Sequence, residues 1–391
     1  MEEEYLIYLT CILLLGTLIS ALANKLKISN VYFLVFSGMI LGGVGLISFP
    51  NNTIIIISTL TMILVVFQNT VELKFGQIKK YSQNSVKLVV LFYFFTIVGL
   101  TYVVFSLFKL NPDRYISLVL SVCFSALIFA IEPDLTIGWN SKRENKTLEF
   151  QKIEELLARP LTLIAPLLLL NYLDSLVSGN SVSLGFEAMI FFRQIFLGLI
   201  IGFIIGVSIL YLLNLNLPEN LAYLIILSSS LAAFIISDYI NASGVISLTV
   251  VGLLFGNYHV KHKIGLEKFT GILGSVFAIF VFFLIGTMML IDFSYLALGT
   301  IVFLIYILIR FVCVLLVLHR SNLTFKNKVY MALNVSKGID TAIIILIMIT
   351  RYNNIEGIDT IINLSLLFSL YGLVLSNIIN LFSHSLLENE S

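Results

Sequence analysis

The chain contains a series of long apolar runs separated by short polar stretches, and this alternation leaves few folds open to it. A helix of about 18 to 25 apolar residues matches the hydrocarbon thickness of a bilayer. Of the 391 residues, 59% are hydrophobic and 12% are charged, whereas soluble domains are roughly 25% charged. The sequence therefore predicts an all-α polytopic membrane protein with about 13 transmembrane helices. The candidate spans are residues 5–23, 31–48, 53–70, 86–108, 115–139, 152–173, 189–213, 220–240, 243–257, 269–291, 294–318, 329–350 and 360–384.

Basic residues in the connecting loops are unevenly divided between the two sides of the predicted membrane. One side carries sixteen of them, namely Lys25, Lys27, Lys74, Lys79, Lys80, Lys87, Lys142, Arg143, Lys146, Lys152, Lys261, Lys263, Lys268, Arg320, Lys326 and Lys328. The other side carries four, namely Lys109, Arg114, Arg193 and Arg351. Because loops rich in lysine and arginine stay in the cytoplasm, we expect a protein of the cell membrane with its N-terminus outside and its C-terminus inside.

Charged residues also occur inside the predicted spans, where inserting each one costs at least about 2.5 to 3.5 kcal/mol. They are Glu132 and Asp134 around Pro133 in the fifth span, Glu154, Glu155 and Arg159 in the sixth, Arg310 in the eleventh, and Lys337 and Asp340 around Gly338 in the twelfth. Proline and glycine interrupt helices, so we expect breaks at Pro133 and Gly338, which membranes tolerate only beside protein or a watery cavity. One charge in each of the four spans, Glu132, Arg159, Arg310 and Lys337, is expected roughly 10 to 12 Å from the cytoplasmic side, at about 1.5 Å per residue. We expect these charges to meet in one site.

The carboxylates of this set are the candidate ion- and proton-binding residues, namely Glu132, Asp134, Glu155 and Asp340. Sodium needs several oxygen ligands, and proton exchange needs a carboxylate that is alternately charged and protonated. A second interpretation remains open, in which Arg159 and Lys337 permanently neutralise these carboxylates and form a fixed ion-pair cluster. We expect no metal site and no cofactor.

An internal repeat links two distant parts of the chain. Ser29, Val31, Gly38 and Gly42 recur as Ser243, Val245, Gly252 and Gly256, each at an offset of 214 residues. The second copy lies seven spans after the first, an odd number, so the two copies are predicted to have opposite orientations. Inverted repeats of this kind are typical of secondary transporters. The plainer alternative is that G-x-x-x-G only packs helices together.

Seven segments occur in the order known from one family: KISNVYFLVFSGMILGGVGL, FQNTVELKFGQIKK, AIEPDL, SGVISLTVVGLLFGN, AIFVFFLIGTMM, IYILIRFVCV and Ser336-Lys337-Gly338. In these segments the chain resembles the cation:proton antiporter superfamily, the bacterial and archaeal sodium/proton exchangers. The resemblance implies the sodium/proton antiporter fold, with inverted repeats and two broken helices, the fifth and the twelfth, that cross in a mobile six-helix core beside a dimerisation domain. It also implies elevator-type alternating access and a homodimer.

The sixth span departs from the family pattern at the ion-binding position. The family has Glu-x-x-x-Asn-Asp or Glu-x-x-x-Asp-Asp, and the last aspartate is its main carrier of cations and protons. Here Glu154 matches the family glutamate, which the resemblance pairs with Arg310, but Ala158 and Arg159 replace the ion-binding pair. The family's Thr-Asp on the fifth helix is similarly Ile131-Glu132.

The resemblance therefore implies a secondary-active exchanger of sodium or potassium for protons, in a lipid bilayer, and no enzyme. We expect one transporter domain over residues 1–391, with repeats at roughly 5–176 and 220–385 linked by the span at 189–213, and no soluble C-terminal domain. The near balance of 23 basic and 22 acidic residues gives no reason to expect nucleic acid as a partner. Because of Ala158-Arg159, a transport-inactive or regulatory protein and an anion carrier remain open as alternatives.

Overall fold

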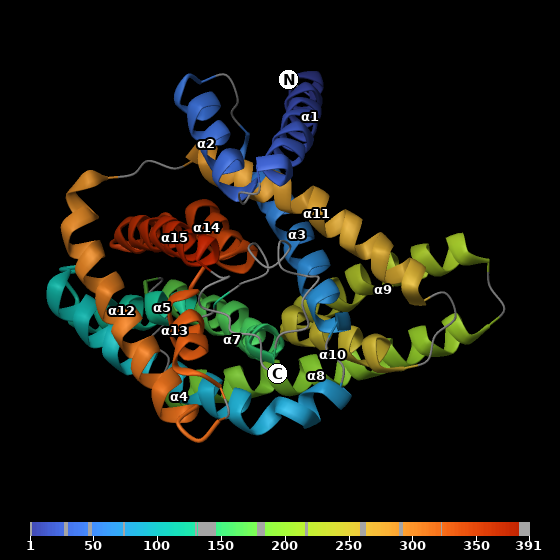
Figure 1. Cartoon of the computed structure of the whole chain (residues 1–391). Helices are drawn as coiled ribbons and strands as arrows, with labels where there is room; N and C mark the ends of the chain where they lie inside the picture. Colours follow the sequence, from blue (N-terminus) through green and yellow to red (C-terminus); the bar gives the residue numbers. More distant parts are fainter. Residues whose placement is uncertain are drawn as a thin grey trace. The chain divides into compact units, whose positions relative to one another are not determined.

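The computed structural model describes residues 2–26, 30–45, 49–72, 75–129, 131, 146–177, 184–215, 218–258, 263–288, 292–321 and 323–382. The regular elements within these ranges are helices, and no strand occurs among them (Figure 1). They are α1 (Glu2–Leu26), α2 (Asn30–Gly43), α3 (Asn51–Glu72), α4 (Phe75–Leu107), α5 (Arg114–Ile128), α7 (Lys146–Val177), α8 (Leu184–Asn214), α9 (Glu219–Tyr239), α10 (Gly244–Asn257), α11 (Lys263–Met288), the 3₁₀ turn η1 (Phe293–Tyr295), α12 (Leu296–Val317), α13 (Phe325–Leu333), α14 (Ile339–Arg351) and α15 (Ile358–Leu381). The predicted all-α fold class is confirmed.

Nine of the described helices are long and apolar enough to cross a membrane. Three shorter apolar helices, Phe33–Gly43, Arg114–Ile128 and Gly244–Asn257, coincide with the second, fifth and ninth predicted spans. The helices α13 and α14 together occupy the twelfth. The total of thirteen spans stays a prediction.

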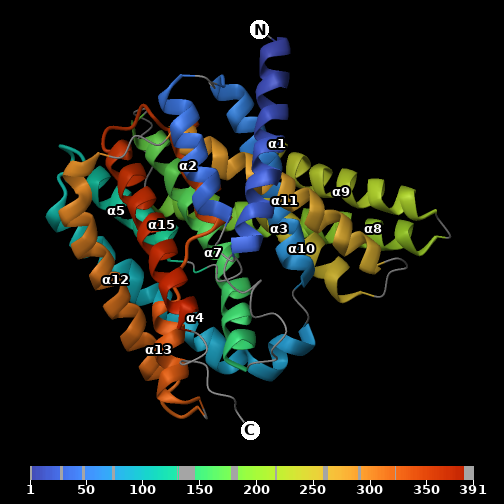
Figure 2. The same ribbon diagram turned by 45° about the horizontal axis from the view of Figure 1, so that its top comes forward.

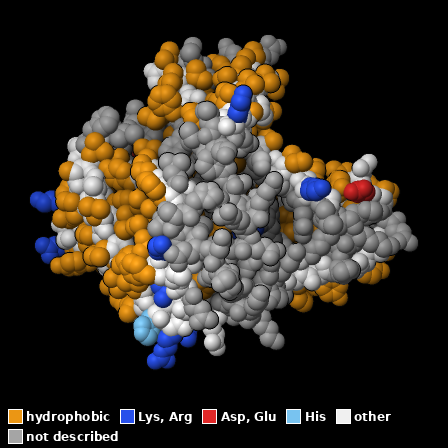
Figure 3. All heavy atoms as spheres, viewed as in Figure 1, with side chains coloured by type: hydrophobic (Ala, Val, Ile, Leu, Met, Phe, Trp, Pro, Cys, Tyr) orange, Lys and Arg blue, Asp and Glu red, His pale blue; other side chains and the backbone are white. Residues whose placement is uncertain are grey.

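The described surface is dominated by large apolar side chains (Figure 3). Leu14, Val90, Phe196 and Leu304, for example, are each more than half exposed on four different helices. A helix satisfies its backbone hydrogen bonds internally and can therefore present such side chains to lipid. The exposed apolar surface is the one expected of a protein solvated by a bilayer.

The chain divides into two compact units, each of which is discontinuous in sequence. The first comprises residues 1–55, 81–174 and 279–391, and the second comprises residues 56–80 and 175–278. In the second unit α8, α9 and α10 pack on one another, and both views of the ribbon show them together (Figures 1 and 2). The first unit contains α5, α7 and α12 to α15, which carry most of the predicted site.

The repeated sequence forms two helices of equal length, α2 and α10, which are both 14 residues long. Their bounds differ by the same 214 residues that separate the repeated letters. Ser243 begins the second copy as the N-cap of α10, where its hydroxyl accepts a hydrogen bond from the backbone N–H of Ile246 at 3.4 Å. The matching Ser29 lies outside the described residues.

The repeated glycines allow close helix packing inside each unit. A Cβ atom on Gly38 would lie 2.9 Å from the Cα of Gly286 on α11, and one on Gly252 would lie 2.9 Å from the Cβ of Thr70 on α3. Both distances are too short for a real side chain, so α2 and α10 each approach a neighbour to a distance that only glycine permits. The glycines thus pack helices, as the plainer alternative predicts, and the inverted relation of the two copies stays a prediction.

Candidate functional site

The twelfth predicted span is interrupted inside the first unit. α13 ends at Leu333, α14 begins at Ile339, and residues 334–338 between them are not helical. The break predicted at Gly338 falls within this segment. Such a break frees backbone N–H and C=O groups at membrane depth, and Asp340 lies in the first turn of α14, where a carboxylate complements the positive end of the helix.

Lys337, within the break, reaches the end of another helix. Its ammonium group donates a hydrogen bond to the backbone carbonyl of Ile128, the last residue of α5, and a second one to the hydroxyl of Tyr306 at 2.6 Å. The same ammonium lies 4.4 Å from the centre of the Tyr306 ring. Lys337 is 1% exposed, so its charge is placed against the negative end of α5 and an aromatic ring.

Glu154 on α7 and Arg310 on α12 form a buried ion pair. Two guanidinium nitrogens of Arg310 donate to the two carboxylate oxygens of Glu154, with one of these hydrogen bonds at 2.7 Å. The Arg310 guanidinium also lies 4.8 Å from the centre of the Phe92 ring. The structure thus brings together the two residues that the resemblance pairs, and it does so with the bidentate geometry that favours strong arginine–carboxylate contacts.

Arg159 lies between two carboxylates of the same unit. Its guanidinium donates to Glu155, one turn earlier on α7, and its Nε lies 3.9 Å from an Asp340 oxygen on α14. All three side chains are buried. We call Glu155, Arg159 and Asp340 the α7–α14 charge group, in which a permanent cation lies beside two carboxylates.

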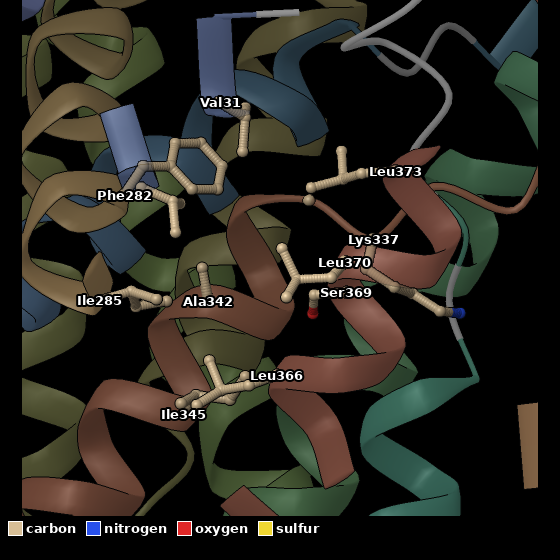
Figure 4. A pocket seen from close by; sticks show the side chains of 12 residues that line it. Val31, Phe282, Ile285, Lys337, Ala342, Ile345, Leu366, Ser369, Leu370 and Leu373 are labelled. Atoms are coloured by element: carbon tan, nitrogen blue, oxygen red, sulfur yellow. The ribbon is translucent and has the colours of Figure 1, made fainter. Parts of the chain in front are cut away.

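A small, mostly apolar pocket borders the broken helix. Its lining includes Val31 of α2, Ile285 of α11, Ile345 of α14 and Leu366 of α15. Lys337 also borders it, but the ammonium group points away from the pocket towards α5 (Figure 4). Apart from Lys337, Gly338 and Ser369 its lining is apolar, so the pocket offers an ion almost no ligands.

The predicted site residues divide into two groups. Glu154, Glu155, Arg159, Arg310, Lys337 and Asp340 lie in the first unit with the contacts given above. Glu132, Pro133 and Asp134 lie outside the described residues. Tyr306 was absent from the prediction, although it lies four residues before Arg310 and hence on the same side of α12.

Comparisons with known proteins identify the family and the fold. The family model described as "Sodium/hydrogen exchanger, transmembrane" matches residues 10–381. The solved structure of the sodium proton antiporter MjNhaP1 from Methanocaldococcus jannaschii at pH 8 superposes with a TM-score of 0.78 at 20% identity, covering 94% of this chain and 97% of that one. An electron-microscopy structure of MjNhaP1 gives a TM-score of 0.76 at 19% identity, covering 98% and 96% of the two chains. The structures show a shared fold, and the match over nearly the whole sequence shows that the chain belongs to the sodium/hydrogen exchanger family.

Proposed function

We propose that this protein is a secondary-active transporter that exchanges a monovalent cation, sodium or potassium, for protons across the cell membrane. The observation that carries the proposal is the α7–α14 charge group, because it places two buried carboxylates beside a helix break at membrane depth. Family membership supports the same reaction type. A transporter, unlike an enzyme, needs only to bind and release its ions from alternate sides.

In the proposed cycle, Glu155 and Asp340 both face Arg159 while no ion is bound. A proton or a cation then binds to one of these carboxylates. Because one carboxylate cannot hold a proton and coordinate a cation at the same time, the two ions replace each other and their fluxes are coupled in opposite directions. Glu132 and Asp134 remain candidates for the same role.

The larger-scale features of the proposal follow the family resemblance. The two compact units work as one transporter domain built from inverted repeats, the site is exposed to the two sides in turn by an elevator-type movement, and the protein is a homodimer. The N-terminus lies outside the cell and the C-terminus in the cytoplasm.

A transport-inactive protein is the second candidate function, and one observation favours it. Arg159 is always protonated, and it already contacts Glu155 and approaches Asp340 at 3.9 Å. It could therefore act as a tethered substitute for the transported cation and keep the site closed. The two carboxylates on either side of Arg159 make the third alternative, an anion carrier, less favourable, because they repel an anion.

Ion flux in proteoliposomes distinguishes these functions. The purified protein is reconstituted with an internal pH dye, and sodium, potassium or choline chloride is added outside. The proposal expects cation-dependent proton movement in the wild type, which Glu155→Gln or Asp340→Asn reduces at least tenfold. Glu356→Gln, which changes an exposed carboxylate, is the matched control and should leave the flux unchanged.

The opposite pattern favours the inactive protein. In that case the wild type shows no cation-dependent flux, and replacing Ala158-Arg159 by Asn-Asp creates it, because a carboxylate then stands at the family's ion-binding position. A chloride-dependent potential with no cation dependence would instead identify an anion carrier.

A further inference from the structure

Gln151 on α7 is a buried amide without a hydrogen-bond partner. It is 2% exposed, and neither the oxygen nor the nitrogen of its side chain has a partner in the part of the chain that the structure describes. Burying an amide without hydrogen bonds is costly, and such groups are nearly always satisfied in native proteins. Gln151 lies one turn before Glu155, on the same side of α7. Its amide therefore indicates that something polar occupies the space beside it.

A second buried amide, that of Asn334, follows the last residue of α13. Leu148 of α7 packs against Tyr330 of α13 and Ile379 of α15 in one buried cluster. Gln151 comes three residues after Leu148, and Asn334, the C-cap of α13, comes four residues after Tyr330, so each lies on the same side as its predecessor and about 4.5 to 6 Å further along. Both helices begin on the side predicted to be cytoplasmic, so we expect the two amides at a similar depth, with Gln151 one turn before Glu155 of the α7–α14 charge group.

The side-chain oxygen of Asn334 likewise accepts no hydrogen bond from the described residues. The residue is fully buried, and its amide nitrogen lies 3.5 Å from the Tyr330 hydroxyl. Asn334 is the first residue of the break between α13 and α14. The backbone carbonyls at the end of α13, which have no helical hydrogen bonds, are therefore close to Asn334.

We propose that Gln151 and Asn334 form a binding site for a monovalent cation, with their two amide oxygens as neutral ligands and the Glu155 carboxylate one turn away as the countercharge. The inference rests on the proposed function, and it places the amide ligand Gln151 one turn along α7 from Glu155 and about two turns from Arg159. Oxygen ligands are those that alkali cations take, and a carboxylate accepts several partners at once, so Glu155 can contact Arg159 and the cation together.

The charges of this region favour a monovalent over a divalent ion. Glu155 already shares its charge with Arg159, and the other two ligands are neutral, so the site holds less than one full negative charge for its occupant. A divalent cation would remain largely uncompensated at membrane depth. A single ordered water is the alternative occupant, and it too would satisfy the amides, but it would give no cation dependence.

Cation-dependent thermal stability tests the site directly, because a ligand that binds the folded protein raises its melting temperature. Purified protein is titrated with sodium chloride or potassium chloride, with N-methyl-D-glucamine chloride keeping the ionic strength constant. In the wild type, one of the two cations should raise the melting temperature in a saturable way. The concentration for half of this effect should increase at least tenfold in Gln151→Met and in Asn334→Leu, and Gln151→Ala serves as the second variant if the first does not fold.

Thr96→Val is the matched control. Thr96 lies on α4, is fully buried, and its hydroxyl has no partner within the described ranges, so the variant removes an equally isolated polar group elsewhere in the same unit. Its half-saturating concentration should equal that of the wild type. The proposal is overturned if neither cation stabilises the wild type, if the Gln151 variants bind within twofold of it, or if Thr96→Val weakens binding as much as they do.

The flux assay separates this proposal from the proposed function. Robust exchange whose cation dependence is unchanged in the Gln151 variants overturns the site and leaves the function standing. Cation stabilisation that depends on Gln151, in a protein without any exchange, supports the site and overturns the function.

Discussion

Glu154 and Arg310 are almost completely shielded from water, so solvent cannot take the place of either charge if it is removed. Arg310 is fully buried and Glu154 is 5% exposed. Removing one member of such a pair typically costs about 3 to 5 kcal/mol, because the other charge is left in a medium that solvates it poorly. The geometry therefore leads to a prediction that concerns stability and not transport.

We expect Glu154→Ala and Arg310→Ala each to lower the free energy of unfolding by about 3 to 5 kcal/mol, and the double variant to lose clearly less than the sum. Thermal unfolding in detergent, followed by circular dichroism, measures the change in stability. Arg320→Ala, which removes an exposed arginine just beyond α12, is the control and should cost little. Strictly additive losses would mean that the two charges do not interact.

The individual charged residues of the site could be predicted from the sequence, but their neutral partners could not. Lys337 and Arg159 stand out because a charge inside an apolar run is rare. Tyr306, Gln151 and Asn334 are ordinary residues in their segments, and only the packing of α7, α12 and α13 makes them important. The pairing of Glu154 with Arg310 came from the family resemblance, since nothing in the spacing of two residues 156 positions apart indicates contact.

At the scale of helices, the approach of α2 to α11 and of α10 to α3 depends on positions without a side chain. A Cβ on Gly42 would lie 2.6 Å from the Cα of Thr287, and one on Gly256 would lie 2.9 Å from the backbone carbonyl carbon of Val71. Backbone atoms cannot move aside as the end of a flexible side chain can. Each added methyl group must therefore push two helices apart.

We expect Gly38→Ala and Gly252→Ala each to lower the free energy of unfolding by about 1 to 3 kcal/mol, the usual cost of overpacking. Gly43→Ala is the control on the same helix as Gly38, because a Cβ there meets no atom within 4 Å. Thermal unfolding of the three variants compares them. Equal melting temperatures for Gly38→Ala and Gly43→Ala would contradict the packing described here.

Hydropathy predicted which segments are helices better than it predicted where they end. The fourth span was expected at 86–108, whereas α4 begins at Phe75, and the seventh was expected at 189–213, whereas α8 runs from Leu184 to Asn214. The reason is that hydropathy detects the part of a helix that lies in hydrocarbon, while the helix continues into the polar interface. The break in the twelfth span was expected at Gly338, but its length was not: residues 334–338 are all outside the helices, and the polar residues among them do not show where α13 ends.

At the scale of the whole molecule, the division of basic residues between the loops predicts the orientation in the membrane. Lys109 follows α4 on the side with few basic residues, and Lys326 lies at the start of α13 on the side with many; both are exposed. Only one orientation agrees with the rule that basic loops stay in the cytoplasm.

We expect Lys109→Cys to be labelled by a membrane-impermeant thiol reagent from outside intact cells, and Lys326→Cys only after the cells are opened. Cys11, Cys123 and Cys313 are first replaced by alanine, and this cysteine-free protein is the control that must stay unlabelled. Labelling of both positions from the same side would refute the predicted topology.

The equal lengths of α2 and α10 bear on how such a chain diverges over generations. Some residues of these helices, such as Phe36 and Ile40 on α2, are exposed, and substitutions there leave the packing of the helices unchanged. Gly38, Gly42 and Gly256 face backbone atoms of a neighbouring helix, and Gly252 faces the Thr70 side chain, so a side chain at any of the four would disturb the packing. Two copies can therefore differ at most other positions while these glycines still mark the register of the repeat.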